Sequence, residues 1–288
     1  MQAAGVKPNV VTYNSLISAY DKGGQWQKAE EAFMKMQAAG VTPNVITYNS
    51  LISAYSKGEQ WERAMEMFKA IQMNALTPNI KTYNPLLSVL WECGQQAKAI
   101  ELFEEASKAG VYPPGDRKFG KLDLHELSKG AALASLTLWL DEMAASTREG
   151  AAGLPATLVV VTGWGKGSRV TGESEVKDAV TAFLADLGSP FEAPSDNPGR
   201  LEAQRTAVGE WLGSSGPVVE RVCNADEEAI GGEQLPQGTC TEAQLGAMTV
   251  KQLRQMAREH RRTPDGSLRV KGFSTANKAA LVAMLLDL

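Results

Sequence analysis

Asp123 and His125 are the side chains of this chain best suited to acid–base chemistry. They stand in the run Leu122-Asp123-Leu124-His125, which ends a short alternating segment, 118–125. Residues two apart in a strand point to the same face of the sheet. A carboxylate beside an imidazole can move a proton, or can grip the 2′-hydroxyl and phosphate of a ribose. The run therefore predicts a catalytic or binding pair at the end of a strand.

A second candidate is the glycine-rich segment 162–169, TGWGKGSR, which follows the apolar run 156–162. A glycine loop after a buried strand presents backbone N–H groups, and Lys166 and Arg169 add positive charge suited to a phosphate. The spacing lacks both the GxxxxGK[ST] of P-loop NTPases and the complete GxGxxG of dinucleotide-binding enzymes. We therefore exclude NTPase and dehydrogenase functions for this segment.

The elements around these two motifs alternate between strands and helices. Such alternation predicts a compact α/β two-layer sandwich over residues 115–223. We expect strands, helices and one helical turn in the following order: strand 118–125, helix 130–146, strand 156–162, helix 173–187, strand 200–204, helical turn 207–212 and strand 218–222.

Residues 1–114 contain an internal repeat. Tyr13, Tyr48 and Tyr83 are 35 residues apart and stand in near-identical runs. Each unit holds two amphipathic segments, such as 11–22 and 25–39, which end at glycines. A pair of short helices cannot bury its apolar faces alone, but stacked pairs can. The period therefore predicts a right-handed α-solenoid with a concave groove.

The runs TYNSLISAY and W..A...F..M...G..PN resemble the pentatricopeptide repeat family, whose members bind single-stranded RNA with one base per repeat. The resemblance covers residues 1–114, and Met1 falls at the register of Met36, so we expect further repeats upstream. It implies that two asparagine pairs, each resembling a pyrimidine reader that prefers C to U, contact the bases: Asn14 with Asn44, and Asn49 with Asn79.

The third unit departs from this pattern. Its counterpart pair is Asn84 with Pro114, and proline has no side-chain donor. Val11 and Ile46 would wedge between bases, whereas Lys81 stands at their register in the third unit. The asparagines also have a purely structural explanation, because asparagine caps helix N-termini; Asn14, in the first turn of its helix, fits that explanation.

LDLH and TGWGKGSRV together resemble the small MutS-related (SMR) domain, over residues 118–223. SMR domains resemble nucleases, so the resemblance implies endonucleolytic cleavage with Asp123 and His125 in the active site. It also implies a phosphate contact at Gly163, Gly165, Lys166 and Arg169. Glu126 stands where bacterial relatives usually have glycine, and its carboxylate could repel a phosphate. A divalent metal cofactor is left open.

The remaining chain divides into an acidic linker, 224–247, with net charge −5, and a basic segment, 248–288, with net charge +5. The basic segment resembles the helix–extended–helix SAP motif, a small DNA-binding module, and a Rho N-terminal-like RNA-binding fold explains the same pattern. Six cations would face phosphates: Arg254, Arg258, Arg261, Arg262, Lys271 and Lys278.

These parts together predict sequence-guided RNA processing, with the repeats holding single-stranded RNA while the SMR domain cleaves or clamps nearby nucleic acid. A non-catalytic adaptor that binds RNA or DNA, or a protein scaffold, remains as an alternative. The sequence has no apolar run long enough for a membrane span, and its three cysteines show no metal-binding spacing. The family resemblance implies a chloroplast or mitochondrial location.

Overall fold

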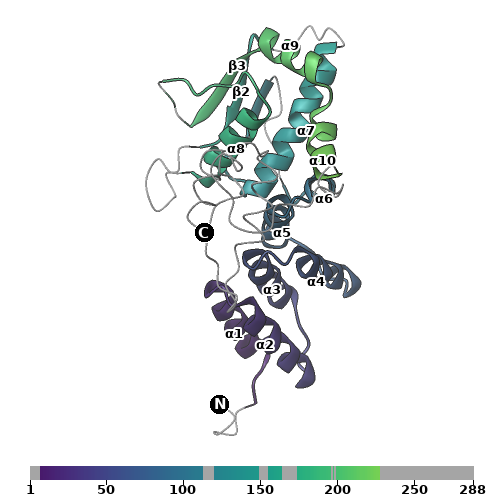
Figure 1. Ribbon diagram of the computed structural model, residues 1–288. Helices are drawn as coiled ribbons and strands as arrows, with labels where there is room; N and C mark the ends of the chain where they lie inside the picture. Colours follow the sequence, from purple (N-terminus) through teal and green to yellow (C-terminus); the bar gives the residue numbers. More distant parts are fainter. Residues whose placement is uncertain are drawn as a thin grey trace, which may run out of the picture.

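The computed structural model describes residues 7–112, 120–148, 155–163, 174–195, 197 and 199–227 (Figure 1). The predictions for the acidic linker, the basic segment and three loop residues, Gly165, Lys166 and Arg169, lie outside the described residues. No helix in the described ranges is long and apolar enough to cross a membrane.

Three helix pairs form the N-terminal part, and they confirm the predicted helical solenoid. The helices are α1 (Val10–Lys22), α2 (Trp26–Ala38), α3 (Val45–Lys57), α4 (Trp61–Met73), α5 (Ile80–Glu92) and α6 (Gln96–Lys108). The first helix of each pair begins at a capping box, in which an asparagine side chain accepts from the third residue of the helix: Asn9 with Thr12, Asn44 with Thr47 and Asn79 with Thr82.

The units stack mainly through the first helix of each pair, because α1 packs on α3 and α3 packs on α5. The stacking buries the same apolar positions in successive units. Leu51 and Leu86 are fully buried, whereas Leu16, at the same position in α1, is 40% exposed. Since contacts between units run through α1, α3 and α5, these helices form the inner layer of the solenoid.

The second part is a three-stranded sheet with accompanying helices. In chain order it contains β1 (Lys121–Asp123), α7 (Lys129–Arg148), β2 (Thr157–Val161), α8 (Glu175–Asp186), β3 (Arg200–Gln204), α9 (Arg205–Ser215) and α10 (Val218–Glu227). The strand order is β1-β2-β3, with β1 parallel and β3 antiparallel to β2. Alternate residues of β2, Leu158 and Val160, are fully buried, so one face of the sheet carries the core.

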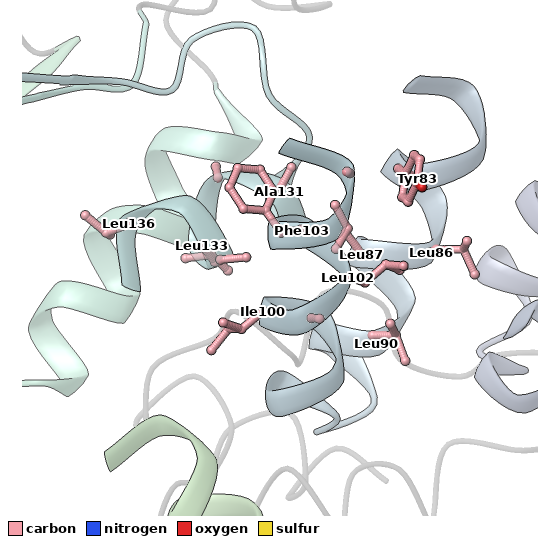
Figure 2. Packing of buried hydrophobic residues seen from close by; sticks show 14 of the residues in the cluster. Tyr83, Leu86, Leu87, Leu90, Ile100, Leu102, Phe103, Ala131, Leu133 and Leu136 are labelled. Atoms are coloured by element: carbon pink, nitrogen blue, oxygen red, sulfur yellow. The ribbon is translucent and has the colours of Figure 1, made fainter. Parts of the chain in front are cut away.

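Helix α7 belongs to both parts of the molecule. It connects β1 to β2, and it also packs against α5 and α6, as α5 packs against α3 and α4 (Figure 1). Figure 2 shows Leu87 from α5, Phe103 from α6 and Leu133 from α7 in one layer of buried side chains. The start of α7 therefore stacks on the array as the first helix of a further unit would.

A glycine and a buried ion pair hold this junction together. A Cβ atom added at Gly130 would lie 2.3 Å from the carbonyl carbon and oxygen of Leu87. Beside it, the Lys129 ammonium is almost fully buried and pairs with Glu92 of α5 and, at 3.6 Å, with Glu175 of α8. The ion pairs compensate the buried ammonium group for its lost hydration, and the Gly130 contact leaves no room for a side chain between α5 and α7.

Several sequence predictions for the second part are corrected. Residues 218–222, predicted as a strand, lie in helix α10, because the Asp141 carboxylate accepts from the N–H groups of Val218 and Val219 and so caps a helix start. Burying Val218 and Val222, four residues apart, then suits a helix. The predicted turn at 207–212 is the longer helix α9, and within the described part of the strand predicted at 118–125, residues 120–125, β1 covers Lys121–Asp123.

We predict that Gly130→Ala destabilises the protein by about 1–3 kcal/mol, because the new methyl group meets backbone atoms that move only if α7 shifts away from α5. Urea unfolding measures the change. The matched control is Gly213→Ala in α9, where an added Cβ meets nothing within 4 Å. The control should leave stability unchanged or raise it by up to about 1 kcal/mol, since alanine favours helices. Equal effects of the two substitutions would contradict the packing argument.

Candidate nucleic-acid interface

The two predicted asparagine pairs are brought into contact by stacking of the units. Asn14 Nδ2 donates to Asn44 Oδ1 at 3.2 Å, and Asn49 Nδ2 donates to Asn79 Oδ1 at 3.4 Å. Each pair joins the first helix of one unit to the start of the first helix of the next. The pair geometry therefore depends on the register between units.

Capping of a helix N-terminus, the purely structural explanation of these asparagines, holds for one member of each pair. Asn44 and Asn79 cap α3 and α5 through their Oδ1 atoms, whereas Asn14 and Asn49 cap no helix. The alternative explanation of Asn14 as a helix cap is wrong, because Asn9 caps α1, which begins at Val10.

Two buried threonines orient these amides, and the sequence analysis did not identify them. Thr47 Oγ1 donates to Asn14 Oδ1 at 2.6 Å, and Thr82 Oγ1 donates to Asn49 Oδ1 at 2.7 Å. Both threonines are fully buried. Their recurrence 35 residues apart, directly before the repeated tyrosine, was the available signal. Because each Oδ1 accepts from a threonine, the NH2 group of Asn14 or Asn49 is fixed toward the neighbouring asparagine.

The hydrogen-bonding capacity left over at each pair is mainly donor capacity. The Asn44 carbonyl oxygen accepts from the backbone, and Asn44 Nδ2 has no partner among the described residues. Asn14 retains one N–H and one lone pair. A pair of this kind can bind a group that offers mostly acceptors.

Asp123 and His125 lie in direct contact, as the alternation predicted. His125 Nδ1 is 2.6 Å from Asp123 Oδ1, and the His125 N–H donates to the same oxygen at 3.2 Å. The hydrogen bond to Asp123 raises the pKa of His125 and outweighs the opposing effect of burial. His125 Nε2 faces Glu126 Oε1 at 3.5 Å, and the imidazole is 51% exposed. Nε2, the ring nitrogen that does not contact Asp123, therefore belongs to a half-exposed imidazole at the surface.

Gly163, from the predicted phosphate loop, lies beside this pair. A Cβ atom added at Gly163 would be 3.0 Å from the His125 Cβ, and its φ of +79° favours glycine. The proximity follows from the parallel pairing of β1 and β2, whose carboxyl ends meet at one edge. Within the described ranges, we find no group of three or more histidine, cysteine, aspartate or glutamate side chains that could hold a metal ion.

Models of two related families match the N-terminal part. The pentatricopeptide repeat domain matches residues 1–58, and the PPR repeat family matches residues 43–91. The chain is 40% identical over 93 residues to the pentatricopeptide repeat-containing protein At2g17033 of Arabidopsis thaliana, covering 32% of this chain and 18% of that one. It is 34% identical over 105 residues to the chloroplastic protein At3g18110 of the same plant, covering 36% of this chain and 7% of that one.

Among solved structures, the chain is similar to the pentatricopeptide repeat protein PPR10 from maize. The TM-score is 0.42 at 18% identity, and the match covers 90% of this chain and 33% of that chain. The chain spans less than a fifth of the length of each of the two Arabidopsis thaliana proteins named above.

We predict that Asp123→Asn lowers the pKa of His125 toward the ordinary value of about 6.5, because the substitution removes the carboxylate that stabilises the imidazolium. Because the pKa of His125 is raised in the folded state, the contact between Asp123 and His125 stabilises the fold fully at pH values below the unfolded-state pKa of the imidazole. This stabilisation is lost as the pH rises through the folded-state pKa of His125. NMR titration of the two imidazoles, His125 and His260, measures both values, with His260→Gln as the assignment control. An unchanged His125 pKa in Asp123→Asn would contradict the assigned cause.

Proposed function

We propose that this chain, whose residues 1–91 are pentatricopeptide repeats, binds single-stranded RNA along α1, α3 and α5 and recognises one pyrimidine at each asparagine pair. The observation that carries the proposal is the recurrence of the same oriented amide pair, Asn14 with Asn44 and Asn49 with Asn79, at successive contacts between units. One base per unit follows from one pair per unit.

The donor-rich character of each pair supports a preference for C over U. Cytosine presents two neighbouring acceptors, N3 and O2, on the edge that it uses for pairing, whereas uracil presents a donor, N3–H, between two acceptors. The unused N–H groups of Asn14 and Asn44 match the cytosine pattern. The exposed apolar side chains of Val11 and Ile46, on the first turns of α1 and α3, supply surfaces against which bases can stack.

We further propose that residues 118–223 form an SMR domain that acts on the bound RNA. The Asp123 carboxylate holds the Nδ1 proton of His125, so that Nε2 is left to accept a proton from a ribose 2′-hydroxyl or from water. Gly163 lies beside the imidazole, at the start of the loop that carries Lys166 and Arg169, which we propose as phosphate contacts. The basic segment 248–288 would add phosphate contacts to RNA or DNA.

One contact favours binding without cleavage as the second candidate function. The Glu126 carboxylate lies 3.5 Å from His125 Nε2 and is 80% exposed. A negative charge there repels a phosphate and competes for the proton that Nε2 would exchange. In this alternative the second part clamps RNA that the repeats have recognised.

The cellular location is proposed as organellar, and as the chloroplast in particular. The support is that related pentatricopeptide repeat proteins of Arabidopsis thaliana and Zea mays are named chloroplastic.

We predict that Asn49→Ala weakens binding to an RNA containing two adjacent cytidines by about fivefold to tenfold, as expected for the loss of a hydrogen bond of about 1–1.5 kcal/mol. The preference for cytidine over adenosine should disappear at one of the two positions only. Fluorescence anisotropy measures both quantities, and Ser50→Ala on the neighbouring position is the control. RNA binding with equal affinity for all four bases at both positions would refute base recognition by the asparagine pairs.

We predict that the double variant Asp123→Ala/His125→Ala lowers the rate of RNA cleavage by at least about 100-fold, because it removes the proposed base and its orienting carboxylate. RNA affinity should be retained, since the repeats are unchanged. Product analysis on gels, with Glu142→Ala on α7 as a control for an exposed acidic residue, measures the rate. Cleavage by the double variant at the wild-type rate would remove the assignment. Binding without any product from the wild-type protein would favour the clamp.

A further inference from the structure

The third unit is built differently from the first two on its inner face. Its asparagine, Asn84, occupies the position of Asn14 and Asn49 in α5, but its side chain has a different partner. Tyr112, which follows α6, donates from its hydroxyl to Asn84 Oδ1 at 2.7 Å. In the first two units, the corresponding bond comes from Thr47 and Thr82.

Tyr112 is a fixed donor that does not itself face the solvent. Its side chain is 2% exposed, and its ring stacks on Phe103 with the ring centroids 5.1 Å apart. Burial raises the pKa of Tyr112, so the hydroxyl keeps its proton. The Asn84 carbonyl oxygen is therefore held toward Tyr112, and the NH2 group at the other end of the amide is directed away from it.

The Asn84 NH2 group has no partner among the described residues. In the first two units this group donates to an asparagine of the next unit, as Asn14 donates to Asn44. Here the start of α7 takes the place of a next unit, and Ser128 Oγ donates to the backbone oxygen of Asn84 at 3.5 Å. The third position thus offers two amide N–H donors and no second asparagine within the described ranges.

Lys81 adds a positive charge to the same face. It precedes Asn84 by three residues in α5, a spacing that places the two side chains side by side on a helix. At the same register, Val11 and Ile46 are apolar and more than half exposed. The surface that would stack on a base in the first two units is therefore replaced by an exposed ammonium group.

We propose that the third position is a phosphate subsite, in which Lys81 and the Asn84 amide hold the RNA backbone without recognising a base. A phosphate oxygen accepts from both N–H donors and the ammonium group, whereas a base would lack a stacking surface at Lys81. The inference rests on the proposed RNA binding. It predicts that the array recognises two bases and anchors the next nucleotide, on the α5 side, through its charge.

The test uses fluorescein-labelled RNAs that carry two adjacent cytidines among adenosines, bound to the full chain. The cytidine whose preference is lost in Asn49→Ala marks the α5 side of the pair. The next nucleotide on that side is then varied through the four bases, and its phosphate is replaced by a neutral methylphosphonate. We expect less than about twofold change among bases, and a threefold to fivefold loss with the neutral phosphate, on the scale of an exposed charge contact.

Variants of the two groups separate charge from base recognition. Lys81→Ala should lower the affinity for the unmodified RNA as much as the methylphosphonate substitution does. It should cause no further loss of affinity for the methylphosphonate RNA. It should also reduce the slope of log affinity against log salt concentration by about 0.7. Lys81→Arg should restore both affinity and slope, and Lys69→Ala on α4 should change neither. Tyr112→Phe removes the hydroxyl that donates to the Asn84 carbonyl oxygen, so base discrimination at the third position should increase. Urea unfolding of this variant shows whether its fold is intact.

The outcomes distinguish this inference from the proposed function. If the third position prefers one base as strongly as the first two, or if the neutral phosphate binds as well as the charged one, the phosphate subsite is wrong and RNA recognition by the asparagine pairs stands. If neither cytidine is preferred over adenosine, the proposed base recognition itself has failed.

Discussion

Stacking of each unit's first helix on the first helix of the next is the interaction on which the rest of the structure depends. It buries Leu51 and Leu86 completely, and burial of a leucine side chain stabilises a fold by about 1.5–3 kcal/mol. The same contact buries Thr47 and Thr82, whose hydroxyls would be costly to bury without partners. Each hydroxyl bonds an asparagine of the preceding unit, so the register between units is set by polar contacts as well as by packing.

The residues proposed to recognise RNA are therefore part of the framework. Asn44 caps the N-terminus of α3, its carbonyl oxygen accepts from Asn14, and its NH2 group has no partner among the described residues. The Asn44 carbonyl group cannot turn toward a base without leaving the N-terminus of α3 uncapped. This restriction limits what each pair can bind, because the acceptor of one amide is used by the backbone and the acceptor of the other is used by a threonine. The tertiary fold thus selects the donor side of the pair for contact with a ligand.

Sharing of α7 between the two parts of the molecule places the second candidate site relative to the first. Gly130 and the buried Lys129 fix the start of α7 on α5, and the strand before α7 ends in the Asp123–His125 pair. The contact of Ser128 with Asn84 lies only three residues along the chain from His125. If RNA binds along the repeats as proposed, the packing of this single helix would place the third unit and the imidazole on neighbouring parts of its path.

The sequence by itself determined the features that depend on local spacing. The 35-residue period predicted the helices of the repeat, because helix formation depends on residues close in the chain. The asparagine pairs were implied by the family resemblance, and stacking of the units brought their members into contact. The Asp123–His125 contact was predictable from local spacing, since the two residues are neighbours on one strand.

Only the tertiary structure decided features that join distant segments. Asp141 turned the β-branched run at Val218 into a helix by capping it across 77 residues of chain. Tyr112 fixed the Asn84 amide from 28 residues away. Gly130 is required by the backbone of α5, a neighbour that no local pattern specifies. In each case the deciding atom is a hydrogen-bond partner or a steric neighbour brought by folding, and its identity cannot be inferred from periodicity along the chain.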